Sequence, residues 1–280
     1  MALALCGAVS YATEPGSEAL PFIRVKADAA VLGLGGTGIG NNTVYSVLGG
    51  DRLSVRAGGA RWMPDINSTT YMGLGGMYNL GNVAFSVDVM SGKGARIESE
   101  DYTPGSLFLQ AGGAYRLTDN ISFGADLVYA SENLLKDYSY SAFAVNAFVA
   151  GRFGGFCFAA GLSSLGSAVS SSTSGKFSLP SSATLDAAYT FRFGESSFKA
   201  AATMDYFFSG TLAASVGAEY KVYDIISARV GYHAGGESVI PSFASAGFGM
   251  QYSGVSFDLA YLFGSESLNG TFALTLGYRF

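Results

Sequence analysis

The stretch AAVLGLGGTGIGNN contains glycines whose spacing could serve nucleotide binding. Gly33, Gly35 and Gly38 match G-x-G-x-x-G, in which glycines let the backbone approach a pyrophosphate at the start of a helix. That use requires an apolar strand before the glycines and a helix after them. VKADAA precedes them and NNTVYSVLGGD follows, so neither flank fits, and no later segment has helical periodicity. We therefore interpret them as positions where the chain turns tightly or passes close to a wall.

Patterns for catalysis or metal binding are weaker still. His233 is the only histidine, so any Ser–His–Asp arrangement would depend on it, and the sequence has no G-x-S-x-G motif. No spacing of His, Cys, Asp or Glu suits a metal site. Cys157 is alone once Cys6 is assigned to a signal peptide, so no disulfide is expected. We predict a protein that is not an enzyme and has no cofactor.

The composition indicates contact with lipid. Charged residues make up 13% and hydrophobic residues 49% of the 280 residues, whereas soluble domains carry about 25% charged residues. No apolar run reaches the roughly 18 residues that a membrane helix needs. Because only helices and closed barrels satisfy the backbone in lipid, this composition predicts a transmembrane β-barrel. The net charge of −5 and the lack of a basic cluster argue against a nucleic-acid partner.

An alternation of period two recurs along the chain. In the last segment, GTFALTLGYRF, aromatic residues and leucines share one face, and small or polar residues share the other. ATLDAAYTFRF, SFKAAATMDYFF and SFDLAYLF likewise separate charges from aromatics, as a polar lumen and a lipid-facing outside require. Fourteen such segments predict an all-β, antiparallel, up-and-down transmembrane barrel. They cover 52–63, 69–79, 81–91, 105–117, 119–131, 138–153, 155–166, 181–193, 195–208, 211–222, 224–235, 243–253, 254–264 and 269–280.

The connections between these segments differ in length. Every second connection is tight, from NLGN after the second strand to SG near the end of the chain. The others include 92–104 and 167–180, with 132–137 and 236–242 of moderate size, while Ser209–Gly210 is short. Outer-membrane barrels have short periplasmic turns and longer external loops. Both chain ends are therefore expected in the periplasm.

Three regions follow along the chain. Residues 1–12 end on Ser10-Tyr11-Ala12 and are interpreted as the last part of a secretory signal peptide. Residues 13–51 are too few for a second domain, and we predict that they fold into the lumen as a plug. Residues 52–280 form the outer-membrane barrel.

The alternation places many charged residues on the lumen side, with both signs on neighbouring strands. Buried charges must pair or stay hydrated, so we predict a polar network that fixes wall and plug; a polar channel is the alternative. His233 is interpreted as a hydrogen-bonding residue of the same face. The network residues are Asp186, Arg192, Lys199, Asp205, Glu219, Arg229, His233, Asp258 and Arg279.

The run PFIRVKADAAVLGLGGTGIG resembles the N-terminal signature of the PorV/PorQ family of Bacteroidetes outer-membrane proteins. The plug motif Asp28, Gly33, Gly35 and Gly38 carries the likeness, and ARWMPD and ARVGYHAGGE are similar to later family motifs. Ala30 stands where the family usually has Arg, and the Asn-Pro-Ala motif before the first strand is missing. The family is related to the FadL fatty-acid transporter, a fourteen-stranded barrel.

The resemblance implies a type IX secretion component that binds the translocon or the C-terminal domains of exported cargo. Its external loops would bind the partner through residues such as Lys93, Tyr102, Lys176 and Phe177. The other expected partners are the outer-membrane bilayer and the barrel-assembly machinery, which would recognise Tyr278 and Phe280 in the terminal GYRF.

A FadL-like transporter of small hydrophobic molecules is the alternative function. It would pass its ligand through an opening in the wall, past a movable plug. Strand kinks at glycine pairs, such as Gly58–Gly59 or Gly112–Gly113, are expected to make that opening.

Overall fold

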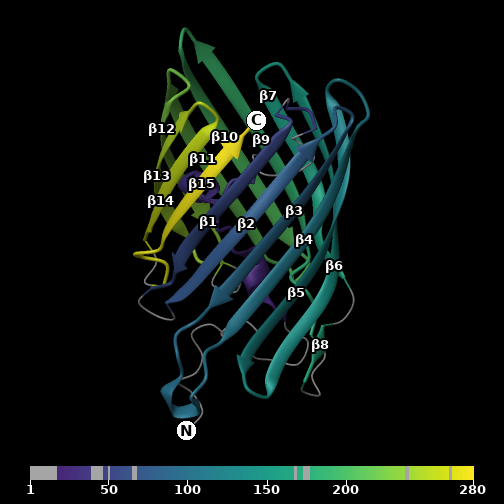
Figure 1. The fold of residues 1–280 in the computed structure, drawn as a ribbon, viewed down its shortest axis with the longest axis vertical. Helices are drawn as coiled ribbons and strands as arrows, with labels where there is room; N and C mark the ends of the chain where they lie inside the picture. The colour runs from purple at the N-terminus through teal and green to yellow at the C-terminus, as the bar shows by residue number, and fades with distance from the viewer. Residues whose placement is uncertain are drawn as a thin grey trace.

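The protein is a closed antiparallel β-barrel (Figure 1). In this computed structural model, β1 pairs with β15 and β5 pairs with β6, so the sheet closes on itself. Fourteen strands make the ring, and the two-residue β8 only adds to β6. The predicted all-β fold and strand number are confirmed. The structure describes residues 18–38, 47–49, 51–64, 68–166, 169–172, 177–236, 240–264 and 267–280.

The strands lie close to the ranges expected from the alternation. Most boundaries differ by no more than a few residues, because turn residues were counted with the strands. The bounds are β1 Leu53–Trp62, β2 Thr69–Asn79, β3 Val83–Lys93, β4 Gly105–Arg116, β5 Ile121–Leu135, β6 Tyr138–Phe153, β7 Phe156–Gly166, β8 Ser170–Ser171, β9 Ser182–Phe193, β10 Ser196–Phe207, β11 Leu212–Val222, β12 Ile226–Ala234, β13 Phe243–Tyr252, β14 Val255–Phe263 and β15 Phe272–Arg279.

The two ends of the barrel differ as expected. The C-terminus and the tight turns lie at one end, here called the turn end, and the longer connections, including 94–104 with η2 (Glu98–Glu100), lie at the opposite loop end (Figure 1). The predicted loop at 132–137 is wrong. The ladder between β5 and β6 continues to the pair Leu135 and Tyr138, so both strands extend further and a tight hairpin joins them.

Outward and inward faces alternate along every strand. On β15, Phe272, Leu276 and Tyr278 are exposed on the outer face, whereas Ala273 and Thr275 are buried on the inner face. Many other large hydrophobic side chains on outward positions, such as Phe123 and Leu185, are also exposed. Such a belt fits a lipid-facing wall around an inner space.

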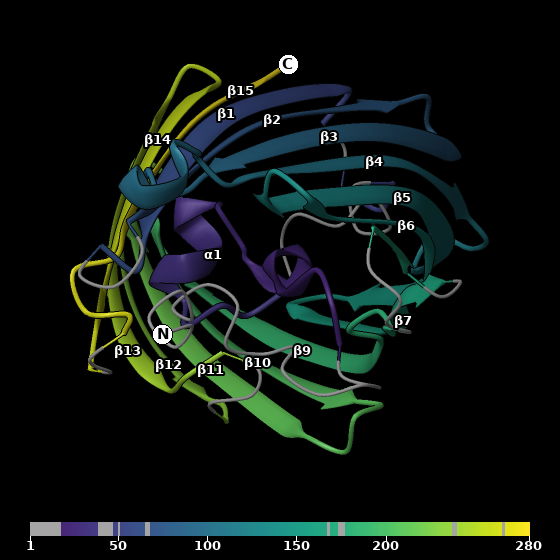
Figure 2. The ribbon, with the colours of Figure 1, turned by 90° about the horizontal axis from the view of Figure 1, so that it is seen from below.

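Residues 18–38 lie inside the ring; we call them the inner segment (Figure 2). The segment begins at the loop end, where Glu18 bridges to Ser178, and it contains η1 (Pro21–Arg24) and α1 (Ala29–Gly33). Val47 and Leu48 lie near the turn end, against Arg116 and Arg152. The region 1–12, interpreted as a signal peptide, lies outside the described residues.

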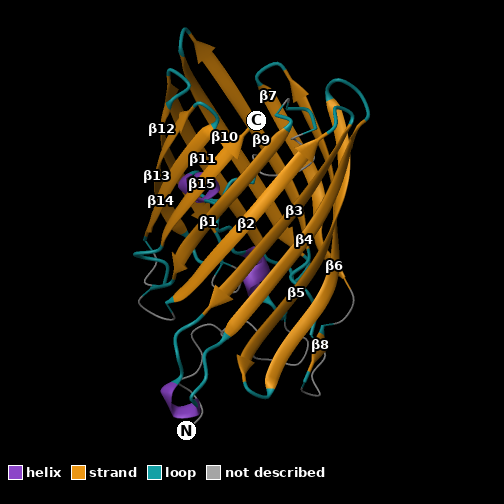
Figure 3. Cartoon of the chain, in the orientation of Figure 1, coloured by secondary structure: helices purple, strands orange, loops and turns teal. Residues whose placement is uncertain are grey.

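The short helix α1 has an identifiable start and stop. The Asp28 side chain accepts hydrogen bonds from the backbone N–H groups of Ala30 (2.9 Å) and Val31 (3.1 Å), as an N-cap does. Gly35 and Gly36 follow with φ of +72° and +81°, a conformation that glycine adopts without strain. The helix ends at Gly33, the first glycine of the motif, which is the reverse of the dinucleotide-binding order. Strands dominate the rest of the chain (Figure 3), and no helix in the described ranges is long and apolar enough to cross a membrane.

Candidate functional site

The inner segment lies directly against the wall formed by β11 to β15. A Cβ atom added to Gly35 would lie 2.6 Å from the backbone nitrogen of Tyr232, and one added to Gly33 would lie 3.1 Å from the Cα of Gly247. The wall also has glycine at positions 217 and 231, where a side chain would collide with Leu34 and Gly35. Glycines on both surfaces therefore allow backbone to contact backbone.

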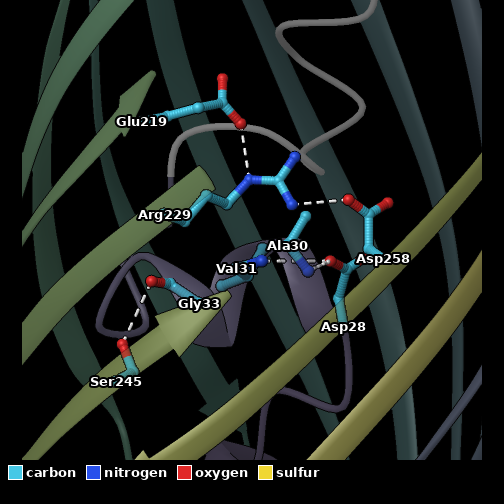
Figure 4. A network of polar contacts seen from close by, with 8 residues as sticks. All are labelled: Asp28, Ala30, Val31, Gly33, Glu219, Arg229, Ser245 and Asp258. Atoms are coloured by element: carbon cyan, nitrogen blue, oxygen red, sulfur yellow. Dashed lines mark hydrogen bonds and ion pairs between the residues drawn. The ribbon is translucent and has the colours of Figure 1, made fainter. Parts of the chain in front are cut away.

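Hydroxyl groups of the wall bind the backbone of the inner segment. The Ser245 Oγ accepts from the Gly35 N–H (3.0 Å) and donates to the Gly33 carbonyl (3.2 Å; Figure 4). The Thr275 Oγ1 accepts from Ala29 N–H at 2.9 Å, and the Thr203 Oγ1 accepts from Gly38 N–H at 2.9 Å. The sequence analysis missed these contacts, because an inward Ser or Thr that binds a backbone group cannot be told from one that faces water.

A buried ion-pair triad lies in the wall beside α1 (Figure 4). The Arg229 Nε donates to Glu219 Oε2 at 2.5 Å, and its Nη1 donates to Asp258 Oδ1 at 2.6 Å. The Arg229 side chain is only 8% exposed. The triad joins β11, β12 and β14, and all three residues belong to the predicted network.

Other predicted lumen residues make smaller contacts. The Thr203 Oγ1 donates to Asp186 Oδ1 at 2.5 Å, and the Thr184 Oγ1 donates to Asp205 Oδ1 at 2.6 Å. His233 Nδ1 lies 2.9 Å from Ser215 Oγ, and its ring stacks on Phe243. The network thus divides into separate groups, of which the one at Asp186 reaches the inner segment through Thr203.

Arg192 and Arg279 are not part of these groups. Both are exposed at the turn end, and the Arg279 Nη1 lies 4.0 Å from the Asp51 carboxylate. Lys199 lies opposite Glu219 in the strand register. Alternation assigns these side chains to a face but does not predict their depth in the barrel, which depends on strand tilt and stagger.

The first strands carry a second polar group that the sequence analysis missed. The Arg56 Nη2 donates to Asp88 Oδ1 at 2.5 Å across Gly75 of the intervening strand. Nearby, the Gln110 amide donates to Asp126 Oδ2 at 3.1 Å. The same inward alternation could have found them, because β1, β3, β4 and β5 place them on the lumen face.

Two arginines hold the chain near the turn end. The Arg116 Nε donates to the Val47 carbonyl at 3.0 Å, and the Arg152 Nη1 donates to the Leu48 carbonyl at 3.1 Å. These contacts fix the path of the chain just before β1. Neither arginine was among the predicted network residues.

Two hollows lie between the inner segment and the wall formed by β1 to β6. The rim pocket, at the loop end, has a volume of about 90 Å³, and the lumen pocket, deeper inside, has a volume of about 330 Å³. Val25 of the inner segment lines both. The rim pocket is lined by apolar residues such as Phe22 and Trp62, whereas the lumen pocket contains Asp88 and Asp126.

The predicted wall openings at glycine pairs are wrong. The ladders run without interruption through Gly58–Gly59 on both sides of β1 and through Gly112–Gly113 on both sides of β4. The register shifts instead between Val145 and Ala147, where β6 meets β7. Ser164 of β7 has φ of +56° there, and its N–H donates to the Asn146 side chain at 2.7 Å. A bulge of this kind locally disrupts the ladder, whereas glycines within a paired strand do not.

Phe148 lies two residues beyond this irregularity. It lines the lumen pocket and also a groove on the outer face. The other residues of that groove include the exposed, outward side chains of Phe123 and Leu185. Phe148 therefore borders both the inner space and the outer surface.

The residues expected to bind a partner protein differ in accessibility. Lys93 is exposed at the end of β3, and Tyr102 is half-buried. Phe177 is also half-buried, and its ring lies 5.3 Å from the Tyr140 ring in an edge-on contact. Lys176 lies outside the described residues. At the other end, Tyr278 and Phe280 are exposed on the outer face.

Solved structures that resemble this chain include proteins described as transporters. No protein-family profile matches the chain, and no curated protein sequence matches it. The toluene transporter TodX of P. putida superposes with a TM-score of 0.64 at 14% identity, over 89% of this chain and 97% of that one. The toluene transporter TbuX of Ralstonia pickettii has a TM-score of 0.61 at 15% identity, over 90% and 98%.

A Pseudomonas aeruginosa FadL homologue superposes with a TM-score of 0.58 at 13% identity, over 91% of this chain and 99% of that one. The chain has the fold of outer-membrane barrels. At these identities the likeness shows the fold alone. The structures named are FadL-type proteins rather than PorV or PorQ, so the resemblance of the N-terminal run to the latter family stays a prediction.

Proposed function

We propose that this chain is an outer-membrane channel for small apolar molecules, with the inner segment as its plug. The observation that carries the proposal is the pair of hollows that share Val25 along one side of the inner segment. Ligand sites are concave and mostly apolar, with a few polar groups, and the rim pocket fits that description. The belt of exposed hydrophobic side chains supports a place in the membrane.

The path begins at the rim pocket, at the loop end, among Phe22, Trp62 and Ile240. An apolar molecule bound there lies next to Val25, and beyond Val25 the lumen pocket widens. Phe148, beside the irregularity of β6 and β7, lines both the lumen pocket and the outer groove, and we propose the exit there. The solved neighbours TodX and TbuX are described as toluene transporters, which supports the same class of cargo.

The attachment of the inner segment supports its role as a plug. All four hydroxyl contacts to its backbone, described above, come from β10, β13 and β15. The hollows lie on the opposite side, against β1 to β6. The segment can therefore obstruct the lumen while it leaves a passage along one wall.

Uptake of toluene into proteoliposomes tests the proposal. Val25→Trp fills the junction of the two hollows with a much larger side chain, so we expect initial uptake to fall at least tenfold. Val87→Trp is the matched control, because Val87 is 58% exposed on the outer face. The proposal is overturned if Val25→Trp and the unmodified protein take up toluene equally fast. It is also overturned if liposomes with the unmodified protein take up toluene no faster than empty liposomes.

The role in type IX secretion predicted from the resemblance has no specific support in the site. Of its candidate loop residues, Phe177 is engaged with Tyr140. Recovery of a translocon or cargo domain with the purified protein, and its loss on deletion of 94–104, would favour that role over transport.

A further inference from the structure

One row of inward residues crosses the wall of the rim pocket. Tyr71 of β2 pairs with Gly92 of β3, Gly92 with Ser106 of β4, and Ser106 with Glu132 of β5. All four line the pocket. Because Gly92 has no side chain, the Tyr71 ring occupies the space above it, and a Cβ there would lie 2.6 Å from Tyr71 Cε1. Two hydroxyls and one carboxylate thus form a polar strip.

The rest of the rim pocket is apolar. Its lining includes Phe22, Trp62, Pro104 and Leu134, and no described lining residue is Lys or Arg. Glu132 takes part in none of the ion pairs found in the described ranges. Among the described residues it is therefore the one acidic group of this pocket, and none of their cations pairs with it.

Other carboxylates of the lumen accept from a cation or from neutral donors. Asp88 pairs with Arg56, and both Glu219 and Asp258 pair with Arg229, whereas Asp126, Asp186 and Asp205 accept from Gln110, Thr203 and Thr184. Placing a carboxylate among apolar side chains is unfavourable unless a cation or a hydrogen-bond donor meets it. The hydroxyls of Tyr71 and Ser106 are the donors on the same strip, and a ligand headgroup can supply the cation, since the strip opens into the hollow.

We propose that the rim pocket selects apolar molecules that carry a hydrogen-bond-donating headgroup, with an ammonium group preferred, and that Glu132 determines this selection. The inference rests on the proposed transport function and narrows its cargo. The headgroup contacts the Glu132 carboxylate, while the apolar body lies against Phe22 and Trp62. A molecule of the same shape that carries a carboxylate is rejected, because two like charges would meet in an apolar site.

The size of the pocket sets the size of the ligand. An apolar cavity of about 150 Å³ holds a benzene molecule. The rim pocket measures about 90 Å³ and adjoins the larger lumen pocket at Val25. It therefore holds the headgroup and part of a single ring, with the rest of the body directed toward Val25.

Binding of three matched probes to the full-length protein in detergent tests the inference. Benzylamine, benzyl alcohol and benzoate share one ring and differ in the headgroup. Calorimetric titration is expected to give affinities in the order benzylamine, benzyl alcohol, benzoate, with at least tenfold between the first two. Glu132→Gln should lower the ratio of benzylamine to benzyl alcohol affinity at least tenfold. Glu100→Gln, on an exposed loop, is the matched control and should leave the ratio unchanged.

A charge reversal guards against a variant that merely misfolds. Glu132→Lys is expected to bind benzoate more tightly than benzylamine, a gain that unfolding cannot produce. A native ratio near one, or the same ratio in Glu132→Gln, would overturn the inference. If toluene uptake depends on Val25 but the ratio is near one, this inference fails and the transport function stands. If toluene is not taken up at all, the transport function fails first.

Discussion

The two sides of the lumen follow the same alternation of inward and outward residues, but one side binds the inner segment and the other borders the two hollows. From β11 to β15, glycines, serines and threonines of the wall approach the inner segment closely, and the Arg229 triad lies beside α1. From β1 to β6, larger inward side chains such as Met90, Phe108 and Arg56 line the lumen pocket. One side is filled and the other is open.

On the filled side, glycines of the wall and of the segment lie opposite each other, whereas Gly58, Gly73 and Gly75 of the open side line the lumen pocket. Small residues let two backbones approach, so hydroxyl groups of the wall can reach backbone groups of the segment. Each such buried hydrogen bond contributes about 0.5–1.5 kcal/mol. The contacts on the filled side therefore fasten the segment by several hydrogen bonds, and the open side is left free for a ligand.

Loss of the Arg229 guanidinium should give the largest effect on stability. Arg229→Leu leaves Glu219 and Asp258 buried without a cation, which typically costs about 3–5 kcal/mol. On the open side, the Arg56 side chain is 35% exposed and Asp88 is 22% exposed, so Arg56→Leu should cost no more than about 1 kcal/mol. Unfolding by guanidinium chloride in lipid vesicles measures the free energy of unfolding of each variant. Equal losses would show that the two sides do not differ in burial.

Gly35→Ala should release the inner segment from the filled side. A non-glycine residue in the left-handed region costs about 1–2 kcal/mol, and the added methyl would lie 2.6 Å from Tyr232 N and 2.9 Å from Val216 O. Neither backbone atom can move without breaking the ladder between β11 and β12. We expect the maleimide reactivity of a cysteine at Val31, in a Cys157→Ser background, to rise at least tenfold.

Gly36→Ala is the matched control for that variant. Gly36 also has positive φ, but the nearest atom to an added Cβ is 3.9 Å away. Only the backbone strain then remains, so the rise in reactivity should be clearly smaller than in Gly35→Ala. The same rise in both would mean that close approach to the wall does not hold the segment.

Most of the fold could be predicted from the sequence, because every strand shows its own alternation of lipid-facing and lumen-facing residues. This two-residue period can be recognised in each strand without knowledge of the others. The predicted ranges, such as 69–79 and 138–153, coincide with β2 and β6. The predicted openings at glycine pairs failed for a physical reason: glycine permits a kink, but Gly58 and Gly112 are held by hydrogen bonds on both sides.

The candidate site was predicted only in part. The alternation placed Arg229, Glu219 and Asp258 on one face, and their pairing follows from their places on β11, β12 and β14. The hollows and the hydroxyl contacts depend on where the inner segment lies, which no local pattern in residues 13–51 specifies. The role proposed for Glu132 could not be predicted from the sequence, because it depends on apolar neighbours, such as Phe22 and Ile240, that are distant in sequence.

Removal of one hydroxyl tests the filled side at its finest scale. Ser245→Ala removes one of two acceptors of the Gly35 N–H, which also donates to the Leu32 carbonyl at 3.0 Å, and it leaves the buried Gly33 carbonyl without the Ser245 donor. An unsatisfied buried backbone group costs about 1–3 kcal/mol, so the cysteine at Val31 should react several-fold faster, though less than in Gly35→Ala. Ser54→Ala changes an inward serine of the open side and should leave the rate unchanged. If Ser54→Ala and Ser245→Ala behave alike, the hydroxyls of the wall do not fasten the segment, and the contrast between the two sides reduces to glycine packing alone.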